Sequence, residues 1–283
     1  MLKTNNFPSG AQVRFLCALL LLLIVSSIAV SQSTAAKPAP TSPGNSSSTA
    51  TVSDTKATQT VVDPTLPGDP VVLKMLEPYS GKVRALDVVI GELDGELKKG
   101  GLGAGTLGNF VADGMRTRAS QMLKHPIDLA ITNSGGLRKS AFTPGEMRVV
   151  DIFELLPFEN ALVEVELTGE QLLKVLAVAT NEPQSGARVV YRSHPDKTTE
   201  FVSATLIDAN GKEHSIDPAA PYRVVTVDYL LSVGGRFSIL QQAATKNPLG
   251  TTIRDALIEY VKGETAAGRK LKGRLDGRFR EAM

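Results

Sequence analysis

Apolar periodicity is confined to residues 69–283, and this division sets the size of any core that the chain can build. Residues 32–68 are rich in Ser, Thr, Ala and Pro and lack apolar periodicity, so their burial cannot offset the entropy lost on ordering. We therefore expect a disordered linker over 32–68 and a folded region over 69–283. A region of roughly 200 residues is large enough for one well-buried domain or two small lobes.

The N-terminus has the pattern of an export signal. An apolar run from Phe15 to Val30 follows basic residues, and residues 1–31 contain no acid. The run is shorter than the roughly 20 apolar residues that a bilayer-spanning helix needs. Ala29 and Ser31 supply the small side chains that signal peptidase requires, so we predict a signal peptide over 1–31 and a periplasmic or extracellular protein. An uncleaved signal anchor is the alternative, and the only cysteine, Cys17, lies in the predicted leader.

The charge balance argues against a nucleic acid or an anionic membrane surface as a partner. The chain has 31 Lys and Arg against 29 Asp and Glu, and two of the basic residues lie in the predicted leader. The mature chain is then nominally neutral and lacks the positive electrostatic field that such partners require. Once the leader is cleaved, we also expect no stable membrane anchor. Four basic residues near the C-terminus alternate with apolar and acidic ones, and we interpret them as the solvated side of a last strand. They are Arg269, Lys270, Lys272 and Arg274.

Helical and strand patterns are interspersed through the folded region. Apolar spacing predicts helices over about 73–86, 107–119, 168–179 and 253–261 and a helical turn over 151–155. Short apolar runs predict strands over 88–93, 128–132, 162–167, 189–192, 201–207 and 224–228. Thr168 and Gln171 have the spacing of a capping box, and Asn210-Gly211 is typical of a hairpin turn. Helices mixed with hairpin-type strands indicate an α+β domain.

The segment Leu97 to Thr106 is rich in glycine but lacks the features of a phosphate-binding loop. No Gly-Lys-Ser/Thr sequence follows it, and no dinucleotide-binding fingerprint surrounds it. We interpret it as a mobile connection.

The histidines are too few and too scattered for a two-metal phosphatase centre. Such a centre needs several His, Asp and Asn ligands around ions roughly 4 Å apart. The three histidines are His125, His194 and His214, and none lies in a His-x-x-x-His or Asp-x-His spacing. We interpret them as surface loop residues, and we expect no metal, no cofactor and no catalytic residue in this chain.

Three loops, each following an apolar segment, carry the candidate binding residues. The first contains Asn133, Gly135, Gly136 and Arg138. Its glycines let the backbone approach a ligand closely, and the planar guanidinium of Arg138 suits a phosphate group. The alternative interpretation is a helix start that carries an exposed arginine.

The second and third loops each offer an aromatic side chain. Phe158 can stack on a base while the amide of Asn160 reads the edge of that base, or Phe158 can simply pack in the core. The third loop begins at Asp228 and includes Gly234-Gly235. There Tyr229 is either a second aromatic face or an ordinary packing residue.

In this order the three loops and their flanking segments resemble the C-terminal domain of 5′-nucleotidases and UDP-sugar hydrolases, from about Val72 to the end of the chain. The matching segments are Leu107-Gly108-Asn109-Phe110-Val111-Ala112-Asp113-Gly114-Met115-Arg116, Thr132 to Arg138, Asp151 to Asn160, Leu167 to Leu172 and Ile253 to Tyr260. Five segments in register make the resemblance specific. It implies the α+β fold of that domain, with mixed sheets covered by helices.

In that family the C-terminal domain grips the nucleotide and presents it to an N-terminal metallophosphatase domain. The resemblance therefore implies that Asn133 and Arg138 contact the ligand, with Arg138 on the phosphate. It also implies Phe158 as one face of a base clamp and Asn160 at the edge of the base.

The third loop departs from the family pattern. The family turn reads Gly-Gly-Asp-Gly, with the Asp on the ribose hydroxyls, whereas Arg236 and Phe237 follow Gly234-Gly235 here. Tyr229 takes the place of the second clamp aromatic if the alignment runs without gaps through Phe237. Direct alignment of the glycines puts Leu230 there instead.

The resemblance covers the substrate-binding domain alone, and the linker over 32–68 is too short to hold a metallophosphatase domain. We therefore expect the nucleotide-binding half of a split, exported 5′-nucleotidase that is inactive by itself. A separate subunit is then expected to carry the divalent metals. The alternatives are a stand-alone protein that binds a nucleotide or nucleoside, and a decayed structural module without catalysis.

Overall fold

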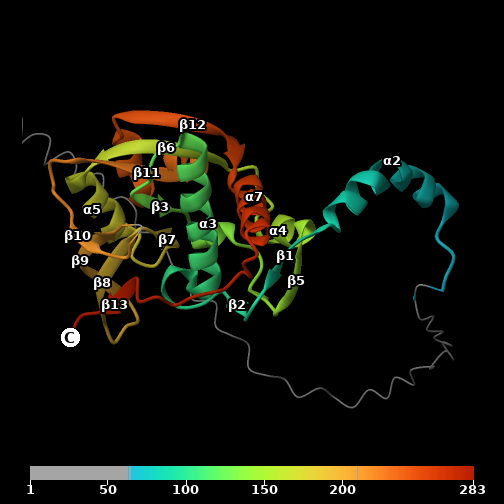
Figure 1. Ribbon diagram of the computed structural model, residues 1–283, viewed down its shortest axis with the longest axis horizontal. Coiled ribbons are helices and arrows are strands. Elements are labelled where there is room, and N and C mark those ends of the chain that lie inside the picture. Colours follow the sequence, from blue (N-terminus) through green and yellow to red (C-terminus); the bar gives the residue numbers. More distant parts are fainter. Residues whose placement is uncertain (1–62, 64, 209) are drawn as a thin grey trace, which may run out of the picture. The chain divides into compact units, whose positions relative to one another are not determined.

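The computed structural model describes residue 63 and residues 65–208 and 210–283. The predicted signal peptide over 1–31 and almost all of the predicted linker over 32–68 lie outside the described residues. Contacts divide the chain into two units, Met1–Thr65 and Leu66–Met283, and the second unit is the one described below (Figure 1). Within the described residues, no helix combines the length and the apolar character that a membrane span requires.

The first helix, α2 (Pro70–Leu86), begins three residues before the predicted helix over 73–86. The Asp69 carboxylate accepts hydrogen bonds from the amides of Val71 at 2.8 Å and Val72 at 3.2 Å, and Pro70 occupies the first helical position. No side chain of α2 is buried. This segment confirms the predicted helix.

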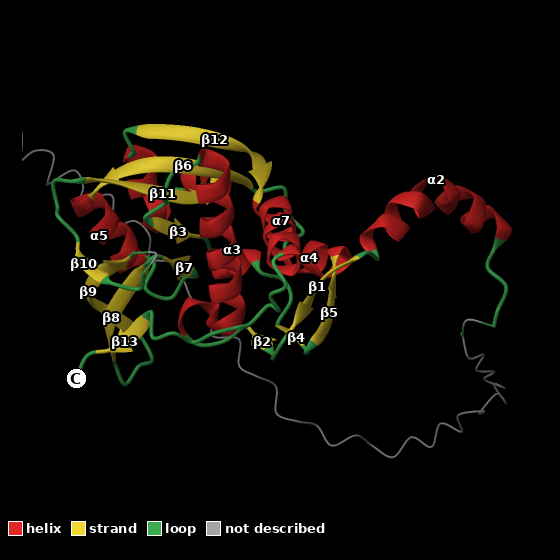
Figure 2. Ribbon diagram, viewed as in Figure 1, coloured by secondary structure: helices red, strands yellow, loops and turns green. Residues whose placement is uncertain are grey.

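A five-stranded sheet forms the centre of the second unit, with the strand order β12-β6-β11-β3-β7 (Figure 2). Its strands are β3 (Leu129–Ile131), β6 (Ala161–Thr168), β7 (Gln184–Ser185), β11 (Pro221–Val227) and β12 (Thr245–Thr252). Strand β3 runs parallel to β11, and the other neighbouring pairs are antiparallel. All three side chains of β3 are fully buried, so both faces of the sheet are covered there.

Helices supply that cover. Helix α3 (Gly105–Leu123) packs on β3 and β7 and against α7 (Ile253–Ala266), while α5 (Gly169–Val178) and α6 (Asp228–Ser232) contact β6 and β11. Gly114 lets α3 and α7 approach, because a Cβ there would lie 2.5 Å from a methyl carbon of Leu257. The capping box of α5 is present, with the Thr168 amide donating to Gln171 Oε1 at 2.9 Å and the Gln171 amide to Thr168 Oγ1 at 3.3 Å.

The remaining strands form smaller sheets. The order β10-β9-β8-β13 joins Glu213–Ser215, Thr199–Ile207, Ala187–Ser193 and Phe279–Glu281. Strand β1 (Val89–Leu93) pairs with β5 (Gly145–Arg148), and β2 (Leu97–Lys98) pairs with β4 (Ala141–Phe142). Helix α4 (Val149–Leu155) follows β5 directly, and short 3₁₀ turns cover Leu102–Ala104, Ser134–Gly136 and Gly235–Gln242. The α+β class with mixed sheets and covering helices is confirmed.

The basic tail is not a strand, and that prediction is wrong. Residues 269–274 are irregular apart from an isolated bridge at Leu271. Their charges are used instead in ion pairs: Arg269 with Glu264 at 2.7 Å, Lys270 with Glu92 at 2.6 Å and Lys272 with Asp94 at 2.7 Å. The alternation of basic and other residues in 269–274 therefore arises because this segment passes other elements and pairs its basic side chains with acidic residues on them.

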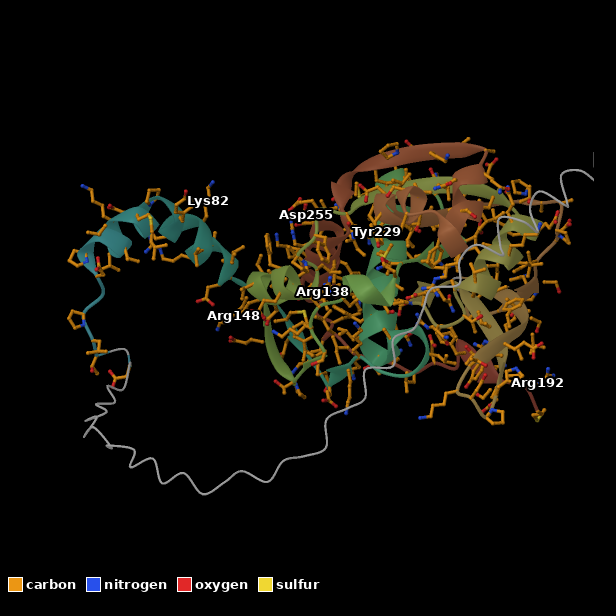
Figure 3. All side chains as sticks on the ribbon, turned by 180° about the vertical axis from the view of Figure 1, so that it is seen from behind. Lys82, Arg138, Arg148, Arg192, Tyr229 and Asp255 are labelled. Carbon is orange, nitrogen blue, oxygen red and sulfur yellow. The ribbon has the colours of Figure 1, made fainter. Side chains whose placement is uncertain are left out.

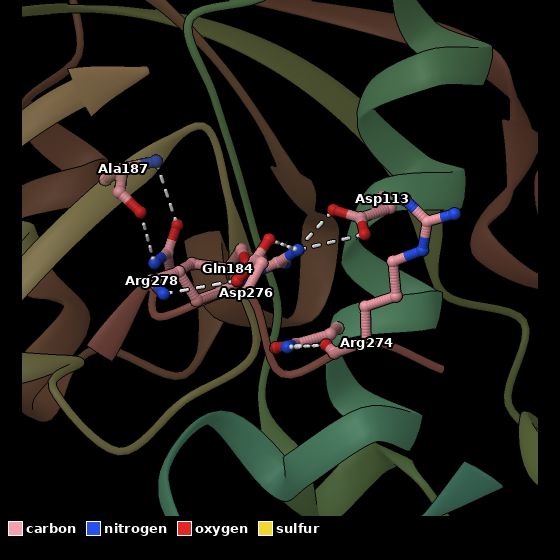
Figure 4. Close-up of polar contacts among 7 residues, drawn as sticks. Asp113, Gln184, Ala187, Arg274, Asp276 and Arg278 are labelled. Atoms are coloured by element: carbon pink, nitrogen blue, oxygen red, sulfur yellow. Dashed lines mark hydrogen bonds and ion pairs between the residues drawn. The ribbon is translucent and has the colours of Figure 1, made fainter. Parts of the chain in front are cut away.

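A buried guanidinium fixes the C-terminal segment (Figure 4). Arg278 donates to both carboxylate oxygens of Asp113 on α3 at 3.0 Å, to Asp276 at 2.7 and 2.9 Å, and to the carbonyl of Gln184 at 2.8 Å. Burial disfavours the charged guanidinium, but these carboxylates outweigh it and raise the pKa of Arg278. Burial likewise opposes ionisation of Asp276, yet the hydrogen bond from Arg278 leaves its pKa below the ordinary value.

The low pKa of Asp276 predicts a pH-dependent contribution to stability. A carboxylate with a lower pKa in the folded chain stabilises the fold above its unfolded pKa, and this contribution is lost as the pH falls through the folded pKa. We expect Asp276→Asn to lower the free energy of unfolding near neutral pH, with a deficit that shrinks as the pH falls below 3.8, the ordinary value for Asp. Urea unfolding of the full chain across this range, followed by circular dichroism, measures the deficit.

The matched control is Glu77→Gln, which neutralises an acid on the exposed helix α2. Its deficit is expected to be small across the same range, because this side chain is exposed and forms no ion pair with any described residue. An Asp276→Asn deficit that does not change with pH would contradict the assigned role of this carboxylate.

Candidate functional site

Sheet topology brings the three loops together at one edge. Strands β3 and β11 are parallel neighbours, with Val224 opposite Leu129, so their carboxyl ends lie at the same edge of the sheet. Strand β6 is antiparallel to β11 and starts at that edge, with Leu162 opposite Val227. The segments over 133–138, 156–160 and 228–237 therefore converge, and they are called the three loops below. The third was predicted as a loop, but it consists of helix α6 and the start of the 3₁₀ turn over Gly235–Gln242.

The first loop holds an oxygen without a partner. Asn133 precedes a 3₁₀ turn over Ser134–Gly136, and its carbonyl accepts a hydrogen bond from the Gly136 amide at 3.1 Å. Gly135 and Gly136 lie against the Asn133 side chain, where added Cβ atoms would come within 3.4 and 3.6 Å of it. Asn133 Oδ1 is buried and accepts no hydrogen bond from any described residue. A buried acceptor of this kind is suited to a donor from a ligand or from water.

Arg138 joins the first loop to the second. Its amide donates to the Leu155 carbonyl at 2.9 Å, and its guanidinium lies 5.0 Å from the centre of the Phe158 ring. Phe158 is 43% exposed, so the interpretation of this ring as a core residue is wrong. Arg138 forms no ion pair with any described residue, which leaves its charge available to an anion.

Helix α7 supports the second loop through Arg254, a residue that the sequence patterns did not mark as part of the site. This buried guanidinium pairs with Glu159 and lies 4.2 Å from the centre of the Phe153 ring. Asn160 is held from the same side, because its carbonyl accepts a hydrogen bond from the Ile253 amide at 2.9 Å. The sequence did contain one signal for Arg254, because a basic residue stands in the first turn of the amphipathic helix α7.

Asp228 joins the second loop to the third. Its carboxylate accepts hydrogen bonds from the amide of Ala161 at 3.1 Å and from the amide of Tyr229 at 2.7 Å. Tyr229 is 47% exposed, whereas Leu230 is only 1% exposed. Of these two alignment choices, only Tyr229 presents its side chain to solvent. Figure 3 shows Arg138 and Tyr229 well away from Arg192, which serves below as a distant control.

A buried carboxylate joins the third loop to the first. Gly234 and Gly235 adopt φ values of 65° and 59°, a conformation that favours glycine, and turn the chain into Arg236. Arg236 pairs with buried Glu182, whose other carboxylate oxygen accepts a hydrogen bond from the Ser134 amide at 2.5 Å. From the sequence, Arg236 was recognised only as a difference from the family turn, which has Asp after the two glycines. No local sequence pattern indicated a role for Glu182.

The histidines lie in pairs with single acids rather than in a shared cluster. His125 lies 3.3 Å from Glu164, His194 lies 3.4 Å from Glu200, and His214 lies 2.8 Å from Asp208. Across residues 65–208 and 210–283, no group of three or more His, Cys, Asp or Glu side chains is arranged to hold a metal ion. The described residues therefore do not fit a two-metal centre.

Comparison with known proteins identifies the family of this domain. A family model for the 5′-nucleotidase C-terminal domain matches residues 86–242. The trifunctional nucleotide phosphoesterase protein YfkN of Bacillus subtilis is 28% identical over 62% of this chain and 12% of its own length. The silent protein UshA(0) of Salmonella typhimurium is 27% identical over 73% of this chain and 37% of its own length. The 5′-nucleotidase of Vibrio vulnificus is 28% identical over 58% of this chain and 28% of its own length.

Solved structures show the same fold. The 5′-nucleotidase precursor from Thermus thermophilus superposes with a TM-score of 0.61 and 25% identity, over 76% of this chain and 44% of that one. The NAD nucleotidase of Haemophilus influenzae superposes with a TM-score of 0.56 over 76% of this chain and 42% of that one, at 18% identity. This chain thus spans less than half the length of each of these relatives.

Glu182 is expected to order the three loops. Replacement by alanine leaves the Ser134 amide without its acceptor and Arg236 without its carboxylate, so Glu182→Ala should lower the free energy of unfolding by about 1 to 3 kcal/mol. It should also speed hydrogen exchange at the Ser134 amide. The control Glu170→Ala removes an exposed pair with Lys174 and should cost less than about 0.5 kcal/mol. Equal effects of the two changes would contradict the bridging role.

Proposed function

Because the chain belongs to the family of 5′-nucleotidase C-terminal domains, we propose that its three loops bind a nucleotide by its base and its phosphate. The observation that supports this most directly is the Arg138 guanidinium, which lies over an exposed aromatic ring and has no ion pair among the described residues. A ring beside an available planar cation suits a molecule with a flat base and an anionic group.

Arg138 is the proposed phosphate ligand. Its guanidinium presents parallel N–H groups to two phosphate oxygens, and such charge-assisted pairs are stronger than neutral hydrogen bonds. The free Oδ1 of Asn133 accepts only, so it would take a hydroxyl or amine proton of the ligand. Gly135 and Gly136 keep this part of the loop free of side chains that would hold the ligand away.

Phe158 and Tyr229 are the proposed faces of the base clamp. Arg138 lies over one face of the Phe158 ring, so the base would use the other face, with Tyr229 as the second aromatic surface. Asn160 is fixed through its backbone to α7 and would read the edge of the base. Glu182, Arg236 and Asp228 would act through the loops by holding them at the spacing that the ligand needs.

Hydrolysis would then require a second component. The relatives with which this chain shares its domain are named as nucleotidases and phosphoesterases, and the chain matches only a fraction of their length. We propose that this domain is the nucleotide-binding half of a split 5′-nucleotidase, acting in nucleotide catabolism with a separate metallophosphatase subunit that carries the divalent metals. The leader pattern over 1–31 supports export of the protein to the periplasm or the exterior.

Calorimetry with matched ligands tests the assignment of Arg138. AMP and adenosine share the base and the ribose and differ in the phosphate, so Arg138→Ala should weaken AMP binding about 10- to 100-fold and leave adenosine binding unchanged. Arg192→Ala, which removes an exposed guanidinium paired with Glu200, should change neither affinity. Equal weakening of both ligands by Arg138→Ala would show that this side chain does not bind the phosphate.

Phosphate release tests the division of labour. The full chain with Mn²⁺, Zn²⁺ or Co²⁺ should release no phosphate from AMP, because binding groups alone do not supply the nucleophile. Addition of a separately made exported metallophosphatase should restore release, and Arg138→Ala should lower the restored rate. Rapid turnover by the chain alone would overturn the split-enzyme proposal while leaving the binding proposal open to calorimetry.

A further inference from the structure

A cavity lies away from the three loops, at the start of helix α3. Its volume is about 540 Å³, within the range of small-molecule sites. The glycine-rich segment over 97–106, the first turns of α3, Tyr191 and the C-terminal segment over 275–279 form its wall. No residue of the three loops contributes to it.

The segment that lines this cavity contains backbone in the left-handed region that favours glycine. Gly101, Gly103 and Gly105 have φ values of 64°, 63° and 62°, and a Cβ on Gly105 would lie 2.5 Å from the Gly100 carbonyl oxygen. The Phe279 ring packs directly on Gly103, where an added Cβ would lie 2.4 Å from a ring carbon. The glycine-rich segment, interpreted from the sequence as a mobile connection, thus has a defined shape that lines a cavity.

A buried acceptor without a partner belongs to this wall. Asn109 lines the cavity and is only 2% exposed. Its Nδ2 donates to the carbonyl of Arg274 at 2.7 Å. Because the Arg274 carbonyl can only accept a hydrogen bond, this contact fixes which end of the Asn109 amide is the nitrogen. The other end, Oδ1, is the atom without a partner in the described part of the chain. That oxygen is buried and accepts no hydrogen bond from any described residue, which is an unfavourable state for a polar atom.

The charges around the cavity balance, and this decides the charge of the ligand. Two acids, Glu96 and Asp276, face two bases, Lys98 and Arg278. Arg278 is already engaged by Asp113 and Asp276. The site therefore lacks the excess positive charge that a phosphate would require, and a neutral ligand fits it better. The Phe279 and Tyr191 side chains contribute aromatic surface to the wall, which suits a ligand that carries an apolar ring.

From this geometry we infer that the cavity at the start of α3 binds a small, neutral ligand that carries an apolar ring and donates a hydrogen bond to Asn109 Oδ1. A primary aromatic carboxamide has these properties. The site is independent of the nucleotide-binding proposal, since it shares no residue with the three loops. A resident water molecule on Asn109 is the competing explanation of the unpaired oxygen.

Two probes that differ in one property separate these explanations. Benzamide carries amide protons, and N,N-dimethylbenzamide keeps the ring and carbonyl but has none. Titration into ¹⁵N-labelled full chain should give saturable shifts at Gly101, Gly105 and the Asn109 side-chain amide. Benzamide should bind about five-fold more tightly than its dimethyl derivative, the effect expected of one neutral hydrogen bond.

Two variants test the cavity by different routes. Asn109→Leu removes the acceptor at similar volume and should abolish the difference between the probes. Because it also removes the bond to Arg274, Leu102→Trp is the second variant, which fills the cavity while retaining Asn109 and should abolish binding of both probes. Val202→Trp, at an exposed position of β9 outside the cavity, should change nothing, and Arg138→Ala should also leave benzamide binding intact.

Three results would overturn the inference. The first is the absence of saturable shifts with benzamide, as expected if water alone occupies the site. The second is equal affinity for the two probes, and the third is unchanged benzamide binding to Leu102→Trp. Loss of AMP binding with benzamide binding intact would count against the proposed function alone.

Discussion

The parallel pairing of β3 with β11 is the constraint on which the arrangement of the three loops depends. Among neighbouring strands of the described five-stranded sheet, this pair alone is parallel, so two strands end at the same edge. Antiparallel β6 begins at that edge. The three loops, over 133–138, 156–160 and 228–237, therefore meet at this edge of the sheet. The residues that would contact a ligand are carried on the segments between strands, with Tyr229 on the short helix α6, while the strands β3, β6 and β11 behind them are largely buried.

Buried charges then fasten segments that are far apart in the sequence. Glu182 accepts from the Ser134 amide and pairs with Arg236, so one carboxylate spans two of the three loops. Arg254 supports the second loop from α7, and Arg278 ties the C-terminal segment to α3. A buried charge that loses its partner is strongly unfavourable, so each pair restricts the chain to one arrangement. Arg138, at the meeting point of the first two loops, differs from these because it has no ion pair among the described residues.

The sequence predicted elements that local patterns stabilise. The capping box at Thr168 and Gln171 and the spacing of apolar residues in α3 and α7 are local signals, and the structure contains those helices. Strand β12 was missed because Pro248 and Gly250 are poor strand residues, and it forms by pairing with β6 at the edge of the sheet. Glu182 could not be recognised, because its role depends on Ser134 and Arg236, which only the fold brings near. Likewise, Tyr229 and Leu230 differ in solvent exposure, and the exposure of two adjacent residues could not be predicted from the sequence alone. The predicted signal peptide and most of the linker lie outside the described residues and stay predictions.

A crystal structure of the full chain with AMP bound tests the central claim most directly, since the claim is that one sheet edge assembles the ligand site. Phosphate oxygens are expected within hydrogen-bonding distance of the Arg138 guanidinium, with the adenine ring stacked on Phe158. AMP bound elsewhere, with the three loops empty and Arg138 still over the Phe158 ring, would contradict this claim.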